Sequence, residues 1–177
     1  MNTPKCLAIA TRGESVLQQR AQEVTQLDDP ELQTIIENML VTVNAANGVG
    51  LAAPQVFIPL RIIIVASKPN KRYPFAPFMQ PLAMINPQIL WQAEETLCGW
   101  EGCLSVPGLR SQVKRPQQIR VRYLDRHGIQ HETDYSDFVA RIILHECDHL
   151  DGKLFLDRLD DTDEVITEEA FQALFPD

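Results

Sequence analysis

The stretch HECDHLDG, residues 145–152, places two histidines, His145 and His149, four positions apart. Each residue of an α-helix advances by about 100°, so these two imidazoles would lie on one face, one turn apart. Glu146 would lie beside that face, close enough to hold a water molecule on a bound metal ion. The HExxH pattern therefore predicts a helix that carries two metal ligands and a general base, although an amphipathic helix with surface histidines would give the same spacing.

A catalytic site of this kind needs a third protein ligand and one open position, whereas a structural site closes all four positions. No third histidine follows the motif, and residue 155 is Phe where the pattern HExxHxxGxxH would have histidine. An upstream thiolate is the alternative. The candidates are Cys103, within EGCLSVPG (101–108), and Cys98, which could equally be a small buried apolar residue.

The composition excludes several classes of protein. The chain has 177 residues, of which 45% are hydrophobic and 23% charged, as is ordinary for one globular domain. Its net charge of −8 argues against a general nucleic-acid binder. No run of about 18 apolar residues is present, and the N-terminal apolar run is too short for a signal peptide. We therefore expect a cytoplasmic protein whose four cysteines are free thiols.

The segments on either side of the motif predict its helix and a preceding hairpin. Ser136 or Asp137 can cap a helix over 138–150, and Gly152 can end it. The alternating stretch 118–135, with a turn at Asp125 to Gly128, predicts a β-hairpin.

Further from the motif, Asp29 before Pro30 predicts the start of an N-terminal helix. The remaining expectations are a loop at 48–55, a strand at 60–66, a long exposed loop at 67–81, strands at 82–90 and 92–97, and a last short helix at about 162–175. We therefore expect one α+β domain over residues 1–177, with an acidic tail at 160–177. Antiparallel or mixed β-sheets would surround a central HExxH helix, accompanied by an N-terminal helix and a short C-terminal helix.

Three segments, GVGLAAPQ (48–55), EGCLSVPG (101–108) and HECDHLDG (145–152), together resemble the peptide deformylases in order, spacing and content. The resemblance runs from about residue 4 to about residue 160. It implies a metal-dependent hydrolase that removes the formyl group from the N-terminal formyl-methionine of nascent proteins and releases formate.

The resemblance implies one divalent metal ion per chain, held by Cys103, His145 and His149, with water in the fourth position. Such an ion lowers the pKa of water from 15.7 to about 7, and Glu146 would accept the proton of that water. The ligand set is compatible with Fe²⁺ and with Zn²⁺. The resemblance favours Fe²⁺ in the cell, with Zn²⁺ or Ni²⁺ as alternatives.

The resemblance also implies the residues that contact the substrate. The side-chain amide of Gln55 and the backbone N–H of Leu104 would stabilise the oxyanion, although Gln55 could also pin its own loop. The backbone of Gly50 would pair with the peptide, and Arg110 would lie near the peptide backbone. The resemblance also assigns Val49 and Ile142 to the methionine pocket, although each could instead belong to the core. Glu101 and Arg115 would form an ion pair that supports the Cys103 loop, or each could be a solvated surface charge.

The chain departs from the family pattern at three positions. Leu144 stands where glutamine is usual, and Asp137 and Ser111 stand where glycine is usual or frequent. These departures could alter rate or substrate preference. The tail 160–177 has seven acidic residues and no Lys or Arg, so we expect that it does not dock the enzyme on ribosomal RNA, although transient proximity to the ribosome fits the resemblance. We expect a monomer that acts on formyl-Met nascent peptides.

Three alternatives remain open. A metallopeptidase would cleave internal amide bonds of unformylated peptides, but the missing downstream ligand argues against it. A non-catalytic metal-binding protein would close its site with a fourth ligand such as Cys98, but it would need neither Glu146 nor Gln55. A related enzyme with altered specificity is suggested by Leu144 and Asp137.

Overall fold

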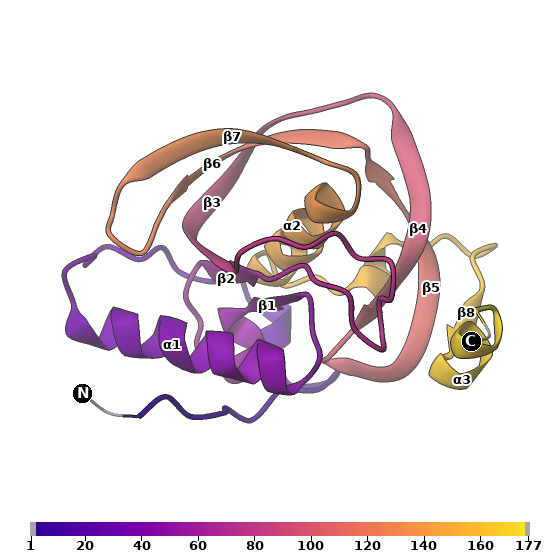
Figure 1. Ribbon diagram of the computed structural model, residues 1–177, viewed down its shortest axis with the longest axis horizontal. Coiled ribbons are helices and arrows are strands. Elements are labelled where there is room, and N and C mark those ends of the chain that lie inside the picture. Colours follow the sequence, from indigo (N-terminus) through magenta and orange to yellow (C-terminus); the bar gives the residue numbers. More distant parts are fainter. Residues whose placement is uncertain (1–2, 176–177) are drawn as a thin grey trace.

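Two antiparallel sheets surround one buried helix in the computed structural model, which describes residues 3–175 (Figure 1). The first sheet has the strand order β1-β2-β3-β6-β7 and the second has the order β4-β5-β8. The strands are β1 (Gly50–Ala52), β2 (Ile62–Val65), β3 (Leu82–Gln92), β4 (Thr96–Cys103), β5 (Val106–Pro116), β6 (Gln118–Leu124), β7 (Gln130–Ser136) and β8 (Val165–Thr167). The helices are α1 (Pro30–Ala45), α2 (Asp137–Leu150) and α3 (Glu168–Ala173), with 3₁₀ turns at Ser15–Gln18, Ala53–Val56 and Phe155–Arg158. The predicted α+β class, with the HExxH segment on the central helix α2, is confirmed.

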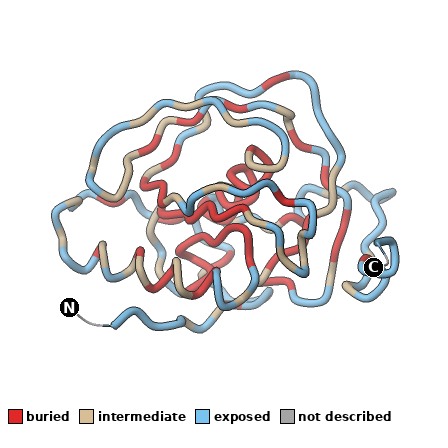
Figure 2. Tube along the Cα trace, in the orientation of Figure 1, coloured by how far each residue is buried: buried red, intermediate tan, exposed pale blue. Residues whose placement is uncertain are grey.

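Helix α2 is enclosed by the rest of the fold (Figures 1 and 2). Every residue from Ala140 to Leu150 is buried, including the polar side chains of His145, Glu146 and His149. Buried polar groups cost free energy unless they find partners, so this helix needs partners from the strands around it. The interior of the domain is therefore where a polar site has to lie.

The prediction of the N-terminal helix is confirmed. The Asp29 carboxylate accepts a hydrogen bond of 2.8 Å from the backbone N–H of Glu31, and Pro30 occupies the first helical position. One face of α1 carries Ile36 and Met39, which are fully buried in a core cluster that includes β2. The predicted strand at 60–66 and the hairpin at 118–135 also form, as β2 and as β6 with β7.

Three predicted boundaries are wrong. The segment 48–55 is not a loop, because Gly50–Ala52 form β1 against β2 and a 3₁₀ turn follows. The segment 92–97 is not one strand, because residues 93–95 connect the end of β3 to the start of β4. The C-terminal helix does not begin near residue 162, because the β-branched Val165–Thr167 pair with β5 before α3 starts. The predicted loop at 67–81 is irregular and largely exposed, and within residues 3–175 no helix is long and apolar enough to span a membrane.

Asp137 starts α2 with a φ of +54°, in the left-handed region that glycine adopts most readily. Asp and Asn are the other residues best tolerated there, which accounts for Asp137 at a position where glycine is usual. Its side chain also accepts a hydrogen bond of 3.1 Å from the Gln117 amide. The departure at this position is therefore compatible with the same backbone.

We expect Asp137→Ala to lower the free energy of unfolding by about 1 kcal/mol, because alanine pays the cost of a left-handed φ without the local hydrogen bond. Asp137→Gly is the matched variant and should stay within about 0.5 kcal/mol of the parent, since glycine adopts this φ freely. Urea denaturation of the three proteins measures both values. Equal stability of the alanine and glycine variants would show that this backbone carries no strain.

Candidate metal centre

The strands and α2 bring three potential metal ligands together. One ligand atom each from Cys103, His145 and His149 lies within 4.8 Å of the other two, and all three residues are buried. Cys103 Sγ is 3.2 Å from His149 Nε2. Typical metal distances are about 2.3 Å to sulfur and about 2.1 Å to nitrogen, so a single ion fits among these atoms. Cys103 comes from the end of β4 and the two histidines come from successive turns of α2, as the HExxH spacing predicts.

The ionisation of Cys103 favours metal binding. Burial alone would raise the pKa of its thiol, but the charge of His149 and contacts with both histidines hold that pKa well below its ordinary value. The thiolate is the form of cysteine that ligates metal ions. The donor set of one thiolate and two imidazoles therefore fits a divalent ion of the iron-to-zinc series.

Glu146 lies beside the ligands without a partner for one of its oxygens. Its side chain is buried, and Oε2 accepts no hydrogen bond from any described residue. Burial raises the pKa of Glu146 to about 7, although the charges of His145 and His149 oppose that shift. A carboxyl group with this pKa can accept and return a proton near neutral pH.

Glu101 is a buried anion that contacts and orients the potential metal ligand His145. Its carboxylate accepts a hydrogen bond of 2.9 Å from His145 Nδ1, which leaves Nε2 of that imidazole for a metal ion. Arg115 donates two hydrogen bonds of 2.9 Å each to Glu101. The predicted ion pair of Glu101 and Arg115 is confirmed, and the solvated alternative is wrong because both side chains are buried.

Two further charged residues complete this network. Arg141 Nη1 donates to Glu101 Oε1 at 2.9 Å, and Asp148 accepts from Arg115 Nη1 at 2.6 Å and from Arg158. Sequence reasoning missed both residues. For Arg141 the sequence did contain a signal, which is helical spacing: Arg141 lies one turn before His145, on the same face of α2.

Gln55 is fixed beside the ligands. Its Oε1 accepts a hydrogen bond of 2.8 Å from the backbone N–H of Ala52, which directs the amide nitrogen toward Cys103. Nε2 lies 3.4 Å from Cys103 Sγ and donates to Ser105 Oγ at 3.1 Å. Gln55 thus pins its own segment and also presents an N–H group toward the ligand cluster.

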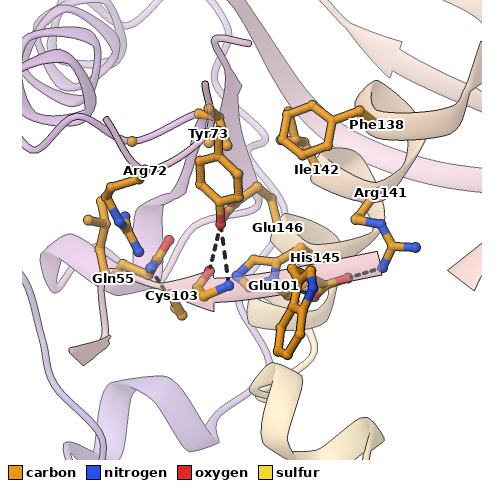
Figure 3. Close-up of a pocket in the computed structure, with 16 residues that line it drawn as sticks. Gln55, Arg72, Tyr73, Glu101, Cys103, Phe138, Arg141, Ile142, His145 and Glu146 are labelled. Carbon is orange, nitrogen blue, oxygen red and sulfur yellow. Dashed lines mark hydrogen bonds and ion pairs between the residues drawn. The ribbon is translucent and has the colours of Figure 1, made fainter. Parts of the chain in front are cut away.

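A pocket with about 430 Å³ of empty space, partly open to solvent, lies over the ligands (Figure 3). Its lining includes the predicted Val49, Gly50, Gln55, Leu104, Ile142 and Glu146. Sequence reasoning missed five other side chains of the lining: Arg72, Tyr73, Trp100, Phe138 and Arg141. Tyr73 comes from the irregular segment 67–81, and its hydroxyl lies 3.3 Å from the backbone N and 3.4 Å from the carbonyl O of Gly102. No local pattern marks an aromatic residue in such a segment as part of a site.

Gly50 leaves the space that Glu146 occupies. A Cβ atom at residue 50 would lie 2.4 Å from Glu146 Oε1 and 2.8 Å from Ile142 Cγ2. Sequence reasoning expected Gly50 to be a glycine so that a peptide could approach its backbone. The structure adds a second reason, which is the close approach of the Glu146 carboxylate.

On the expectation that Glu146 is a general base, Gly50→Ala should lower kcat of the expected metal-dependent hydrolysis by about 100-fold, because a displacement of about 1 Å would remove the alignment of Glu146 with the reacting atoms. The variant should still bind metal with the parent stoichiometry, since no ligand moves. Steady-state kinetics and metal analysis of the same preparation measure both properties. Parent-like kcat would show that Glu146 tolerates this displacement.

Arg110 is the predicted site residue that the structure places outside the pocket lining. It does not line the pocket, and its side chain is fully buried. Nε and Nη2 donate to the Glu168 carboxylate at 2.8 and 3.0 Å, and Nη2 also donates to the carbonyl of Arg72 at 3.3 Å. The C-terminal segment folds back and supplies the counter-charge. Arg110 therefore lies between α3 and the pocket-lining residue Tyr73, whose ring centroid is 4.6 Å from its guanidinium.

Cys98 does not join the cluster. It is exposed, so the expectation of a small buried residue is wrong. Among residues 3–175, the ligand group around Cys103 has three members and does not include Cys98. A structural site closed by Cys98 is therefore not formed.

Comparisons with known proteins agree with this geometry. The family model described as polypeptide deformylase matches residues 6–165. Peptide deformylase 2 of Nostoc sp. is 50% identical over 171 residues, which cover 97% of this chain and 96% of that protein. Peptide deformylase 2 of Shewanella oneidensis is 47% identical over 87% of this chain and 84% of that protein. The Met-Ala-Ser-bound class I type b peptide deformylase of Acinetobacter baumannii is similar in structure, with a TM-score of 0.87, 46% identity and coverage of 89% of this chain and 100% of that chain.

Proposed function

The chain belongs to the polypeptide deformylase family, and from this membership we propose how its own residues carry out the reaction. It is a metal-dependent hydrolase that removes the N-terminal formyl group from nascent peptides. The observation that carries the assignment of residues is the buried cluster of Cys103, His145 and His149 with the partly unpaired carboxylate of Glu146 beside it.

In this proposal Cys103, His145 and His149 hold the ion. A divalent ion bound there supplies Lewis acidity, which lowers the pKa of water and polarises a carbonyl group. Glu146 accepts a proton from the water that attacks the formyl carbon and later donates it to the leaving amine nitrogen.

Two donors would stabilise the oxyanion that develops on the formyl oxygen. The first is Gln55 Nε2, whose direction is fixed by the hydrogen bond from Ala52 to the other end of the amide. The second is the backbone N–H of Leu104, which follows the ligand Cys103. Val49 and Ile142, both apolar and both in the pocket lining, would contact the methionine side chain.

The finer expectations about metal, partners and location are also proposals. We propose Fe²⁺ as the ion in the cell, with Zn²⁺ or Ni²⁺ able to replace it, because a thiolate with two imidazoles accepts all three. The substrates would be formyl-Met nascent peptides in the cytoplasm, and the enzyme would act as a monomer and a single domain. The acidic tail 160–177 would not bind ribosomal RNA, and ribosome binding that required an intact tail would contradict this.

The test is formate release from formyl-Met-Ala-Ser. The protein would be purified without oxygen and loaded in parallel with Fe²⁺, Ni²⁺ or Zn²⁺, with chelator-treated protein as the control. We expect release that requires metal, and we expect no cleavage of the unformylated peptide Met-Ala-Ser. No formate from fully metallated protein would contradict the proposed function, and cleavage of the unformylated peptide would favour a peptidase.

A further inference from the structure

The short turn between β4 and β5 lies inside the protein. Leu104 and Ser105 form it, between the last residue of β4 and the first residue of β5. Turns usually lie at the surface, where water satisfies their backbone polar groups. Ser105, however, is 0% exposed. Its N–H, C=O and hydroxyl groups therefore need partners within the protein.

Each polar group of Ser105 contacts a different part of the molecule. The backbone N–H donates to Cys103 Sγ at 3.4 Å. The backbone C=O accepts a hydrogen bond of 2.8 Å from the N–H of Arg12. The hydroxyl oxygen accepts a hydrogen bond of 3.1 Å from Gln55 Nε2. Ser105 thus contacts a potential metal ligand, the N-terminal segment and the proposed oxyanion donor.

The N-terminal segment connects Ser105 to Gln55 a second time. The N–H of Ala10 donates to the carbonyl of Gln55 at 2.7 Å, and two residues later the N–H of Arg12 donates to Ser105. Gln55 and Ser105 are 50 residues apart along the chain. Both of their backbones are nevertheless held against one segment, independently of the contact between their side chains.

The hydroxyl of Ser105 fixes the second end of the Gln55 amide. The backbone N–H of Ala52 can only donate, so its hydrogen bond of 2.8 Å to Oε1 sets which end of the amide carries the nitrogen. That nitrogen has two N–H groups. One donates to Ser105 Oγ, and the other faces the ligand cluster, where Nε2 lies 3.4 Å from Cys103 Sγ (Figure 3). The amide plane therefore cannot turn without breaking a hydrogen bond.

Ser105 acts on the site only through its neighbours. It is not among the described residues that line the catalytic pocket, whereas Gln55 is. A donor that already points at the position of the developing charge stabilises the transition state without a cost of reorientation. Without the hydroxyl, the Gln55 amide would keep its bond from Ala52 but could turn its nitrogen away from that position.

We propose that Ser105 is a positioning residue for the reaction, and that its hydroxyl directs one N–H group of Gln55 toward the formyl oxygen in the transition state. The inference rests on the proposed function and adds to it a residue that touches neither the substrate nor the reacting atoms. Because the oxyanion develops only in the transition state, loss of this hydroxyl lowers kcat and leaves KM unchanged.

The first test is steady-state formate release from formyl-Met-Ala-Ser by metal-loaded protein. Ser105→Ala should lower kcat by about tenfold, because a misdirected donor costs less than the roughly 100-fold loss expected for Gln55→Ala. Adding Ser105→Ala to Gln55→Ala should cause no further loss, since the two residues act as one unit.

Ser111→Ala is the matched control. Ser111 is equally buried, and its hydroxyl donates a hydrogen bond of 2.7 Å to the carbonyl of Glu164, away from the pocket lining. This variant should keep the parent kcat. Ser105→Ala removes one oxygen atom and leaves both backbone contacts of residue 105, so thermal unfolding and metal content should also stay close to the parent values.

A second measurement observes the amide without turnover. Zn²⁺ has a filled d shell, so the Zn²⁺-loaded protein gives ordinary NMR spectra, and the side-chain NH₂ signal of Gln55 is identified by its loss in Gln55→Ala. Exchange of this NH₂ group with solvent protons should be about fivefold faster in Ser105→Ala, the factor that corresponds to one hydrogen bond. Ser111→Ala should leave the exchange rate unchanged.

Three outcomes would overturn the inference while leaving the proposed function intact. The first is an equal loss of kcat from Ser105→Ala in the parent and in Gln55→Ala, since Ser105 would then act independently of the amide. The second is a parent-like kcat or exchange rate in Ser105→Ala. The third is a Ser105→Ala protein that does not fold or does not bind metal, which would show a purely structural role. Failure of the metallated parent to release formate would instead contradict the proposed function.

Discussion

Glu146→Gln is expected to reduce kcat for formate release by about 10³-fold, the range observed when a positioned general base is removed. Glutamine has the shape of glutamate but cannot accept a proton, so in the proposed mechanism water attack and departure of the amine would both lose their proton carrier. The metal ligands are unchanged, because Glu146 is not one of the three clustered residues. The loss should therefore fall on kcat at constant metal content.

The comparison needs three measurements on one preparation: formate release, metal content and thermal stability. The variant should be at least as stable as the parent, since it replaces a buried carboxyl group that lacks a partner for Oε2. A chelator-treated parent sample gives the background rate. If the metallated variant kept its rate within about tenfold of the parent, another group would have to carry the proton.

Glu101→Gln is expected to have the largest effect on stability. Glu101 is buried and accepts hydrogen bonds from Arg115, Arg141 and His145. Burial alone would raise the pKa of its carboxyl group, but Arg115 and His145 hold that pKa far below the ordinary value. Removing its charge leaves the buried Arg141 guanidinium without its anion and leaves Arg115 with Asp148 alone. We expect the free energy of unfolding to fall by about 3–5 kcal/mol and metal affinity to fall by about 10- to 100-fold.

Glu132→Gln is the matched control for this variant. Glu132 also pairs with an arginine, Arg122, at 3.2 Å, but both side chains are 43% exposed. Exposed pairs contribute about 0–1 kcal/mol, so this variant should remain close to the parent. Urea denaturation and metal titration against a competing chelator measure both effects. Equal behaviour of the two variants would show that the buried network does not support the site.

The fold was predictable where short-range patterns dominate. Asp29 with Pro30 marks the start of α1, and the turn at 125–128 marks the hairpin of β6 and β7, because capping and turn chemistry act within a few residues. Strands β1 and β8 were missed because each has three residues and forms only through pairing with distant partners. Such pairing leaves almost no periodic signal in the sequence.

The candidate site, like the fold, could be predicted only in part. HExxH spacing points to His145, His149 and Glu146, and the family resemblance adds Cys103 and Gln55. The lining residue Tyr73 and the network residue Asp148 were missed, because charged and aromatic residues look alike in sequence whether they are buried or exposed. The pairing of Arg110 with Glu168 could not be predicted, because Glu168 lies 58 residues away along the chain.

The separation of the ligands in the chain has a thermodynamic consequence. Cys103 ends a strand of one sheet, whereas His145 and His149 belong to the central helix, so the three atoms converge only after both have packed together. An ion that binds the folded chain and not the unfolded one adds RT ln(1 + [M]/Kd) to stability, about 2.7 kcal/mol at 100 times Kd. Supply of metal would therefore influence how long each molecule survives proteolysis, as well as whether it is active.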